Sequence, residues 1–187
     1  MLVGVLALQG DFLEHCLLLS SLNVGFVEVR RASELDKCNA LIIPGGESTV
    51  ISKLLLETGL DQEIKKRVKK GLPLLGTCAG AIISAKRVRS EDRFSPLGLI
   101  DIEIERNSYG RQIDSFETEL SVQGKKIRGI FIRAPVIRKV GAKVKVLASF
   151  DNTPVLVKEK NVIVSTFHPE LVGEKFVHEL LLKEVRK

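Results

Sequence analysis

The residues best suited to covalent chemistry are centred on Cys78, in the pentapeptide Gly-Thr-Cys-Ala-Gly at 76–80. The apolar run 72–75 before it is typical of a buried parallel strand, and 81–86 after it favours a helix. Glycines two residues before and two residues after a nucleophile, at a strand-to-helix turn, form the pattern of a nucleophile elbow. The dipole and free N–H groups of the helix N-terminus favour a thiolate there. The pattern therefore predicts a cysteine nucleophile.

The other two cysteines have a simpler interpretation. Cysteine is among the most buried residue types and usually only packs. Cys16 lies in a leucine-rich amphipathic segment and Cys38 just before an apolar strand, so we expect both in the core. Three cysteines without close spacing predict neither a disulfide framework nor a zinc site. A reduced catalytic thiol leads us to expect a cytoplasmic protein.

A cysteine nucleophile needs a base, and the chain has only three histidines. His15 and His178 fall within expected helices. His168 follows the apolar strand 162–164, so it lies at or just past a strand's carboxyl end, where functional groups in open α/β sheets gather. His168 is therefore the predicted base.

A base in turn needs an orienting group. Pro169 ends the strand, and Glu170 is two residues after His168, close enough to reach a ring nitrogen. We predict a triad of Cys78, His168 and Glu170. The alternative is an ordinary loop histidine next to a surface carboxylate.

A glycine turn follows the strand 40–43 at the same sheet edge. Backbone N–H groups in such a turn are open to a ligand oxygen and could hold an oxyanion beside Cys78. A plain turn with Ser48 as a helix N-cap is the alternative. A phosphate-binding loop is not expected, because no Gly-Lys-Ser/Thr sequence ends the turn.

Two arginines are candidates for substrate binding. Arg106 begins the polar stretch 106–112, and Arg133 interrupts the apolar end of a strand. Two guanidinium groups near a cleft could bind a carboxylate. Each one alone would more commonly be a surface salt-bridge residue.

Composition narrows the class of protein. With 187 residues, 44% hydrophobic and 28% charged, we expect one domain, 1–187, with a substantial core. No apolar run is long enough for a membrane span, and no signal peptide is expected. The net charge is +6, but basic residues do not alternate with aromatic ones, so we expect no nucleic-acid partner. A solvated surface or an acidic protein partner explains the charge better.

Strand and helix patterns alternate in the first half. This order predicts an α/β fold with a doubly wound, mostly parallel sheet flanked by helices, similar to flavodoxin. In the second half the period changes, which predicts added antiparallel strands, a hairpin turn at 123–126 and a closing helix at 174–185. The expected strands are 2–8, 25–29, 40–43, 72–75, 99–105, 116–122, 127–132, 143–147, 154–157 and 162–164, and the other helices 12–22, 48–56, 62–70 and 81–86.

Together these motifs resemble the class I, or triad, glutamine amidotransferases. Within them the chain is most similar to the glutaminase subunits of pyridoxal 5′-phosphate synthase, the PdxT/SNO family. The elbow and the His-Pro-Glu sequence mark the whole superfamily. More specific are Pro-Gly-Gly-Glu-Ser-Thr at 44–49, Arg-Asn-Ser-Tyr-Gly-Arg-Gln at 106–112 and Ile-Arg-Ala-Pro at 132–135. The matching segments cover nearly the whole chain.

The resemblance implies a role for each matching residue. Cys78 would be the nucleophile, His168 the base and then the acid, and Glu170 its partner. The backbone N–H groups of Gly46 and Ala79 would form the oxyanion hole. The implied glutamine contacts are Gly46, Glu47, Ser48, Arg106, Ile132 and Arg133.

The implied reaction is hydrolysis of L-glutamine through a γ-glutamyl thioester, with no metal or cofactor. Ammonia would pass through a tunnel to a barrel-shaped synthase subunit, in a ring complex of twelve synthases and twelve glutaminases. The segment at Gln9 and Gly10 is a candidate docking surface for that subunit. Three other hypotheses remain: a glutaminase of another synthase such as imidazole glycerol phosphate synthase, a noncatalytic binding subunit, and a cysteine peptidase of similar fold.

Overall fold

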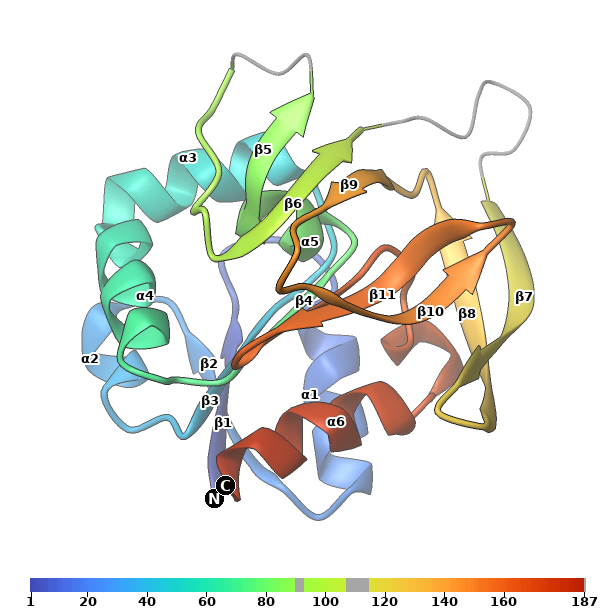
Figure 1. Cartoon of the computed structure of the whole chain (residues 1–187). Helices are drawn as coiled ribbons and strands as arrows, with labels where there is room; N and C mark the ends of the chain where they lie inside the picture. The colour runs from blue at the N-terminus through green and yellow to red at the C-terminus, as the bar shows by residue number, and fades with distance from the viewer. Residues whose placement is uncertain (90–92, 107–114, 187) are drawn as a thin grey trace.

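The structure is a computed structural model that describes residues 1–89, 93–106 and 115–186 of the chain. Within these residues the central sheet has the strand order β10-β11-β12-β4-β3-β1-β2 (Figure 1). The last five strands in this order are parallel, and β10 and β11 extend the sheet in antiparallel pairing. The strands are β1 (Leu2–Leu6), β2 (Gly25–Val29), β3 (Ala40–Ile43), β4 (Leu74–Thr77), β10 (Lys145–Phe150), β11 (Thr153–Glu159) and β12 (Val162–Ser165).

The order of the parallel strands confirms the predicted fold class. Starting from β2, the sheet runs β2-β1-β3-β4-β12, which is the flavodoxin-like order. The winding direction reverses between β1 and β3. In such sheets ligands bind outside the carboxyl ends of the strands at this reversal. The loops that follow β1, β3, β4 and β12 are therefore the ones that can build a site.

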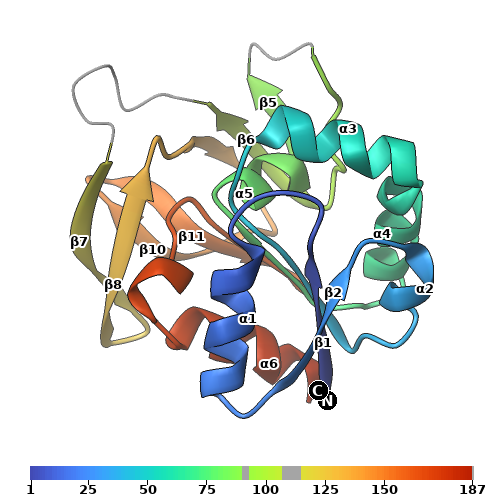
Figure 2. The ribbon, with the colours of Figure 1, turned by 180° about the vertical axis from the view of Figure 1, so that it is seen from behind.

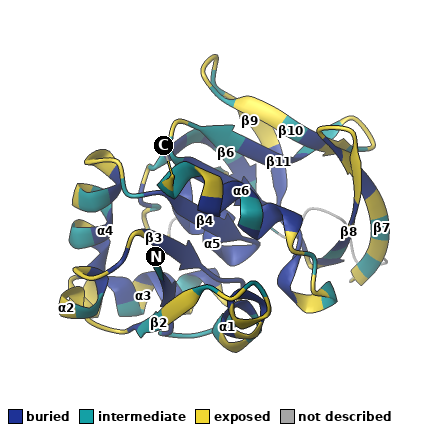
Figure 3. Ribbon diagram, turned by 90° about the horizontal axis from the view of Figure 1, so that it is seen from below, coloured by how far each residue is buried: buried dark blue, intermediate teal, exposed yellow. Residues whose placement is uncertain are grey.

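Helices cover both faces of the sheet (Figures 1 and 2). Successive strand residues point to opposite faces, so Leu41 packs in one core and Ile42 in the other. The central strands of the sheet are buried, whereas the helices expose their outer sides (Figure 3). One face carries α1 (Phe12–Ser21) and α6 (Phe176–Val185), and the other α2 (Ala32–Leu35), α3 (Ser48–Thr58), α4 (Leu60–Lys69) and α5 (Ala79–Ser84).

The second half adds antiparallel strand pairs, as expected, and they form two smaller sheets. One is the hairpin of β7 (Ser115–Val122) and β8 (Lys125–Ile132). Its turn residues Gln123 and Gly124 both have positive φ, as a two-residue type I′ turn requires. The other sheet joins β5 (Ala85–Arg89), β6 (Ile100–Glu105) and β9 (Val136–Val140).

The expected helix 81–86 is partly wrong. Helix α5 ends at Ser84, and the chain continues directly into β5, which pairs in parallel with β6. The helix stops because other backbone donors take its last carbonyl groups: the N–H groups of Leu97 and Leu99 donate to Ile83 and Ser84. No helix in the described part of the chain is long and apolar enough to span a membrane.

Two glycines allow α5 to approach the sheet closely. A Cβ on Gly80 would overlap the carbonyl oxygen of Ile43 at the end of β3. A Cβ on Gly76 would lie 2.6 Å from the carbonyl oxygen of Gly80. Both neighbours are backbone atoms, which cannot move aside as the end of a side chain can. The first turn of α5 can therefore sit against β3 and β4 only if both positions are glycine.

We expect Gly80→Ala to lower the free energy of unfolding by about 1–3 kcal/mol, because the backbone must shift to accept the methyl group. The matched control is Gly25→Ala on β2, where an added Cβ meets only ordinary contacts at 3.4 Å and beyond. Urea denaturation of both variants measures the difference. Equal stability of the two variants would contradict the close packing of α5.

Candidate active site

Cys78 lies at the turn between β4 and α5, as the elbow pattern predicts. Its backbone has φ 47 and ψ −101, a conformation that non-glycine residues rarely adopt. Its N–H donates to the carbonyl oxygen of Ser165 at 2.9 Å, which ties the turn to the end of β12. Cys78 is 8% exposed. Strain of this kind is typical of functional positions, where the surrounding structure holds it in place.

His168 follows β12 and lies beside the elbow. Its Nδ1 is 2.7 Å from Oε1 of Glu170, the first residue of the short 3-10 helix η1 (Glu170–Val172). Its backbone N–H donates to Ile130 on β8 at 2.8 Å. The ring packs on the glycine turn after β3: a Cβ on Gly45 would overlap its Cε1 atom. The structure thus brings together the three predicted triad residues.

The charges of the triad depend on one another. Burial lowers the pKa of His168, but hydrogen bonds and charge interactions with Cys78 and Glu170 outweigh burial and raise that pKa to about 11. Burial raises the pKa of Glu170, and the hydrogen bond from His168 opposes this rise. The arrangement therefore favours an imidazolium at His168, between the sulfur of Cys78 and the carboxylate of Glu170, and such a partner activates a cysteine nucleophile.

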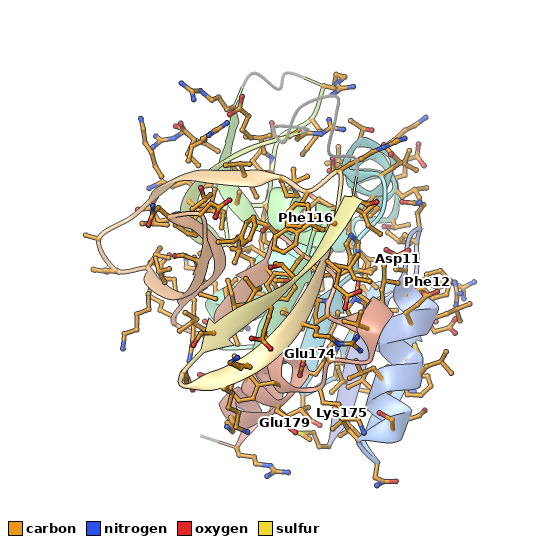
Figure 4. The ribbon with its side chains drawn as sticks, turned by 90° about the vertical axis from the view of Figure 1, so that its right-hand side faces the viewer. Asp11, Phe12, Phe116, Glu174, Lys175 and Glu179 are labelled. Atoms are coloured by element: carbon orange, nitrogen blue, oxygen red, sulfur yellow. The ribbon has the colours of Figure 1, made fainter. Side chains whose placement is uncertain are left out.

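Asp11 is a further acidic group at the site that sequence reasoning missed. Its Oδ2 lies 3.3 Å from Nδ1 of His168. It immediately precedes α1, as Figure 4 shows together with Phe12, on the side of the molecule that carries the β7–β8 hairpin. Its position just after Gln9 and Gly10, at the end of the first predicted strand, was the available signal.

The same three side chains are the candidate metal ligands. Atoms of Asp11, His168 and Glu170 lie within 4.8 Å of one another. However, Nδ1 of His168 is already bonded to Glu170, and in an imidazolium this nitrogen carries a proton that repels a cation. The cluster therefore suits a proton better than a metal ion.

The loops after β1 and β3 interlock next to Cys78. Oε1 of Gln9 accepts a hydrogen bond from the N–H of Glu47 at 2.8 Å. Gly46 has φ 146, and a Cβ on it would lie 2.6 Å from the same Gln9 oxygen. On the other side, Ala79 is the first residue of α5, so its N–H belongs to the helix end that lacks intrahelical acceptors. The N–H groups of Gly46 and Ala79 are the two predicted oxyanion donors.

The structure describes the surroundings of some predicted glutamine contacts more fully than those of others. Ser48 is buried at the start of α3, and its Oγ has no hydrogen-bond partner among the described residues. Ile132 and Arg133 are exposed at the end of β8, shortly after the Ile130 carbonyl that binds His168. Arg106 follows β6, but the rest of its polar stretch, 107–112, lies outside the described residues.

The two remaining histidines continue from the triad, His15 next to Glu170 and His178 next to His15, which the sequence did not reveal. Nε2 of His15 lies 3.6 Å from Oε1 of Glu170 and 3.1 Å from Oγ1 of Thr77. Nδ1 of His15 lies 2.8 Å from Nε2 of His178. Both histidines were expected in helices, and both are there, on α1 and α6. A histidine on the apolar face of each helix was the only signal.

Comparison with known proteins identifies the family of the chain. A family model described as the SNO glutamine amidotransferase family matches residues 5–187. The chain belongs to this family. Its fold is also that of a solved structure described as a glutamine amidotransferase, with a TM-score of 0.95, 47% identity and 99% of each chain covered. The family expected from the sequence is therefore confirmed.

Curated relatives are similar to this glutamine amidotransferase along their whole length. A protein of Thermus thermophilus named pyridoxal 5′-phosphate synthase subunit PdxT is 48% identical over 97% of this chain and 96% of its own. One of the same name from Thermotoga maritima is 45% identical over 100% of both chains. A solved structure described as PurLQS from Thermotoga maritima is 18% identical over 97% of each chain, with a TM-score of 0.68, and shares the fold.

We expect iodoacetamide at pH 7 to label Cys78 first, at least about 100-fold faster than the other two cysteines. Burial raises the pKa of Cys16 to about 11 and also raises that of Cys38, so both stay protonated. Peptide mass spectrometry over a time course measures the three rates. His168→Asn should slow labelling of Cys78 alone, and similar rates at all three cysteines would contradict the activation of Cys78 by His168.

Proposed function

We propose that this glutamine amidotransferase hydrolyses L-glutamine to L-glutamate and ammonia with Cys78 as nucleophile. His168 acts as base and acid, and Glu170 as its charged partner. One observation carries the proposal: Cys78 is held in a strained turn at the N-terminus of α5, and it interacts with His168, whose Nδ1 lies 2.7 Å from a buried carboxylate.

The first half-reaction forms a thioester. The sulfur of Cys78 attacks the carbon of the glutamine side-chain amide, and the carbonyl oxygen becomes an oxyanion. Backbone N–H groups of Gly46 and Ala79 stabilise it, and losing one such donor typically costs about 10²–10³ in rate. Because Nδ1 of His168 is bonded to Glu170, the other ring nitrogen, Nε2, gives its proton to the leaving nitrogen. The C–N bond breaks and ammonia leaves.

The second half-reaction restores the enzyme. His168, now neutral, takes a proton from a water molecule, and the resulting hydroxide attacks the γ-glutamyl thioester. The C–S bond breaks, the thiolate of Cys78 leaves, and glutamate is released next to a protonated His168. The sum is glutamine and water giving glutamate and ammonia, with no oxidant, metal or cofactor required.

The amino-acid end of glutamine needs its own contacts. Arginine binds a carboxylate with two parallel hydrogen bonds, which suits the α-carboxylate of the substrate. The unpartnered hydroxyl of buried Ser48 supplies a polar atom near the glycine turn. The family resemblance implies glutamine contacts at Gly46, Glu47, Ser48, Arg106, Ile132 and Arg133, and we propose the same residues for this chain.

The names of the curated relatives suggest where the ammonia goes. They are subunits of pyridoxal 5′-phosphate synthase, so we infer that this chain supplies ammonia to the synthase subunit of such a complex in the cytoplasm. The twelve-plus-twelve ring of the family is the expected assembly. The site draws on residues from Gln9 to Glu170, which supports one glutaminase domain spanning 1–187.

The deciding experiment measures glutamate release from L-glutamine, with and without the barrel synthase of a pyridoxal 5′-phosphate-forming complex. We expect turnover that rises with the synthase and is abolished in Cys78→Ala. Equal turnover with and without the synthase would assign the glutaminase to another amidotransferase. Thiol labelling at Cys78 without any turnover would favour a binding subunit, and cleavage of peptides would favour a peptidase.

Gln9 should be needed for turnover because its side chain holds the glycine turn at the N–H of Glu47. We expect Gln9→Ala to lower synthase-stimulated kcat by about 10²-fold, the cost of losing one oxyanion donor, because Gly46 is freed to turn away. Gln62→Ala on α4, where the amide bonds Asp61, is the matched control. Steady-state kinetics measures both variants. Unchanged kcat with weaker synthase binding would instead make Gln9 a docking residue.

A further inference from the structure

A chain of buried polar groups continues from the triad into the core between α1, α6 and β4. Oε1 of Glu170, which accepts from His168, is 3.6 Å from Nε2 of His15. The same His15 nitrogen is 3.1 Å from Oγ1 of Thr77, and its Nδ1 is 2.8 Å from Nε2 of His178. His15 and His178 have no exposed surface. The two helices that carry them lie on the same face of the sheet (Figure 2).

Burial favours the neutral form of both rings of this histidine pair. Burial lowers the pKa of His15 well below its usual value, and the nearby His178 and His168 act in the same direction. Burial lowers the pKa of His178 to about 3, although the backbone of Glu174 acts in the opposite direction. A neutral pair has a clear consequence: it does not compete with His168 for the negative charge of Glu170.

Geometry favours one direction for the hydrogen bond between the two rings. If His178 donates from Nε2, then His15 carries its proton on Nε2, and this N–H faces Thr77 and the carboxylate of Glu170. If His15 donates instead, its lone pair faces the carboxylate. The proton of His178 then moves to Nδ1, where the backbone of Glu174 is its acceptor, although outside normal hydrogen-bond geometry. A lone pair that faces a buried carboxylate is unfavourable, whereas an N–H there stabilises the negative charge, so the first direction is favoured.

The carboxylate of Glu170 needs such support. Its side chain has no exposed surface, and Oε2 has no hydrogen-bond partner among the residues that the structure describes. Burial raises its pKa, and the negative charge of Asp11 adds to this effect. Asp11 also lies 3.3 Å from Nδ1 of His168 and competes for the same proton. If Glu170 took up a proton, it would lose its strength as the acceptor for His168.

We propose that His15, fixed by His178, is a positioning residue that keeps Glu170 ionised and aimed at His168. It does so as a neutral ring with its proton on Nε2, a dipole whose positive end faces Oε1 of the carboxylate. The proposal rests on the proposed triad for its catalytic meaning. The protonation pattern of the pair can be measured without any assay of turnover.

The first test is nuclear magnetic resonance of the protein labelled with ¹⁵N-histidine. Long-range correlations of the ring protons with both nitrogens distinguish the two neutral forms and the imidazolium. His15→Gln and His178→Gln assign the signals. We expect His15 to be protonated on Nε2 and unprotonated on Nδ1 from pH 5 to pH 8. A proton on Nδ1 alone, or a charged ring, would overturn the proposal.

The second test compares two amides at position 15. The amide nitrogen of glutamine can occupy the place of Nε2 and donate to Glu170, whereas that of asparagine reaches only the place of Nδ1. We expect His15→Asn to lower kcat by about 10- to 100-fold with little change in KM, the usual cost of removing a group that orients a reacting one. His15→Gln should keep most of the activity. Cys16→Ala, a buried change on the same helix, controls for lost stability.

The pH dependence separates positioning from packing. Removing the N–H raises the pKa of Glu170 further, so the carboxylate is protonated at a higher pH. The groups that face it are His168, His15 and Asp11, and Thr77 and His178 complete the cluster. We expect the acidic limb of kcat/KM, and of Cys78 alkylation, to move up by about one pH unit in His15→Asn but not in His15→Gln.

The outcomes distinguish the two proposals. If the wild type labels at Cys78 but never hydrolyses glutamine, the proposed function fails, while the histidine spectra and the alkylation profile still decide the role of His15. If glutamine is hydrolysed and both amide variants behave alike, in kcat and in the acidic limb, the positioning role is wrong. Equal losses in Cys16→Ala would also overturn it.

Discussion

The close approach of α5 to the backbone of β3 and β4 is the constraint on which the site depends. Because Gly76 and Gly80 lack side chains, the first turn of the helix sits directly on the sheet, and the strand-to-helix connection has to be sharp. That sharpness forces Cys78 to a positive φ. The glycine turn after β3, next to the same helix end, then leaves room for the ring of His168.

Next to this backbone contact, the protein buries a carboxylate in an apolar core that disfavours its charge. The face of the sheet that carries α1 and α6 is otherwise packed with aliphatic and aromatic side chains. Glu170 is buried there, with one oxygen bonded to His168 and the other without a partner in the described residues. A buried carboxylate of this kind lowers the stability of the folded protein, because buried charge must be compensated by partners. Local rules of folding are broken at functional sites and compensated elsewhere.

Sequence alone predicted the parts that depend on local pattern. The elbow, the parallel strands and the hairpin turn at Gln123 have signatures that are short and chemically required. The sequence failed where distant residues decide: α5 ends at Ser84 because residues after Arg93 bond its carbonyl groups. The contacts of His15 with Glu170 and of His178 with His15 could not be predicted for the same reason, since helical spacing predicts a buried face but not what that face contacts. The position of Asp11 at the site could be predicted only with the knowledge that the loops after β1 and β3 interlock.

The grouping of all three histidines in one cluster leaves the rest of the protein without the side chain that normally titrates near neutral pH. Two of them have pKa values shifted downward by burial, and the third has one shifted upward by its partners. The histidines therefore add almost nothing to the buffering capacity of the free protein around neutrality. Calorimetry in buffers of different ionisation enthalpy can exploit this property. If a proton is exchanged when a glutamine analogue binds, the histidines would contribute almost nothing to the measured proton exchange.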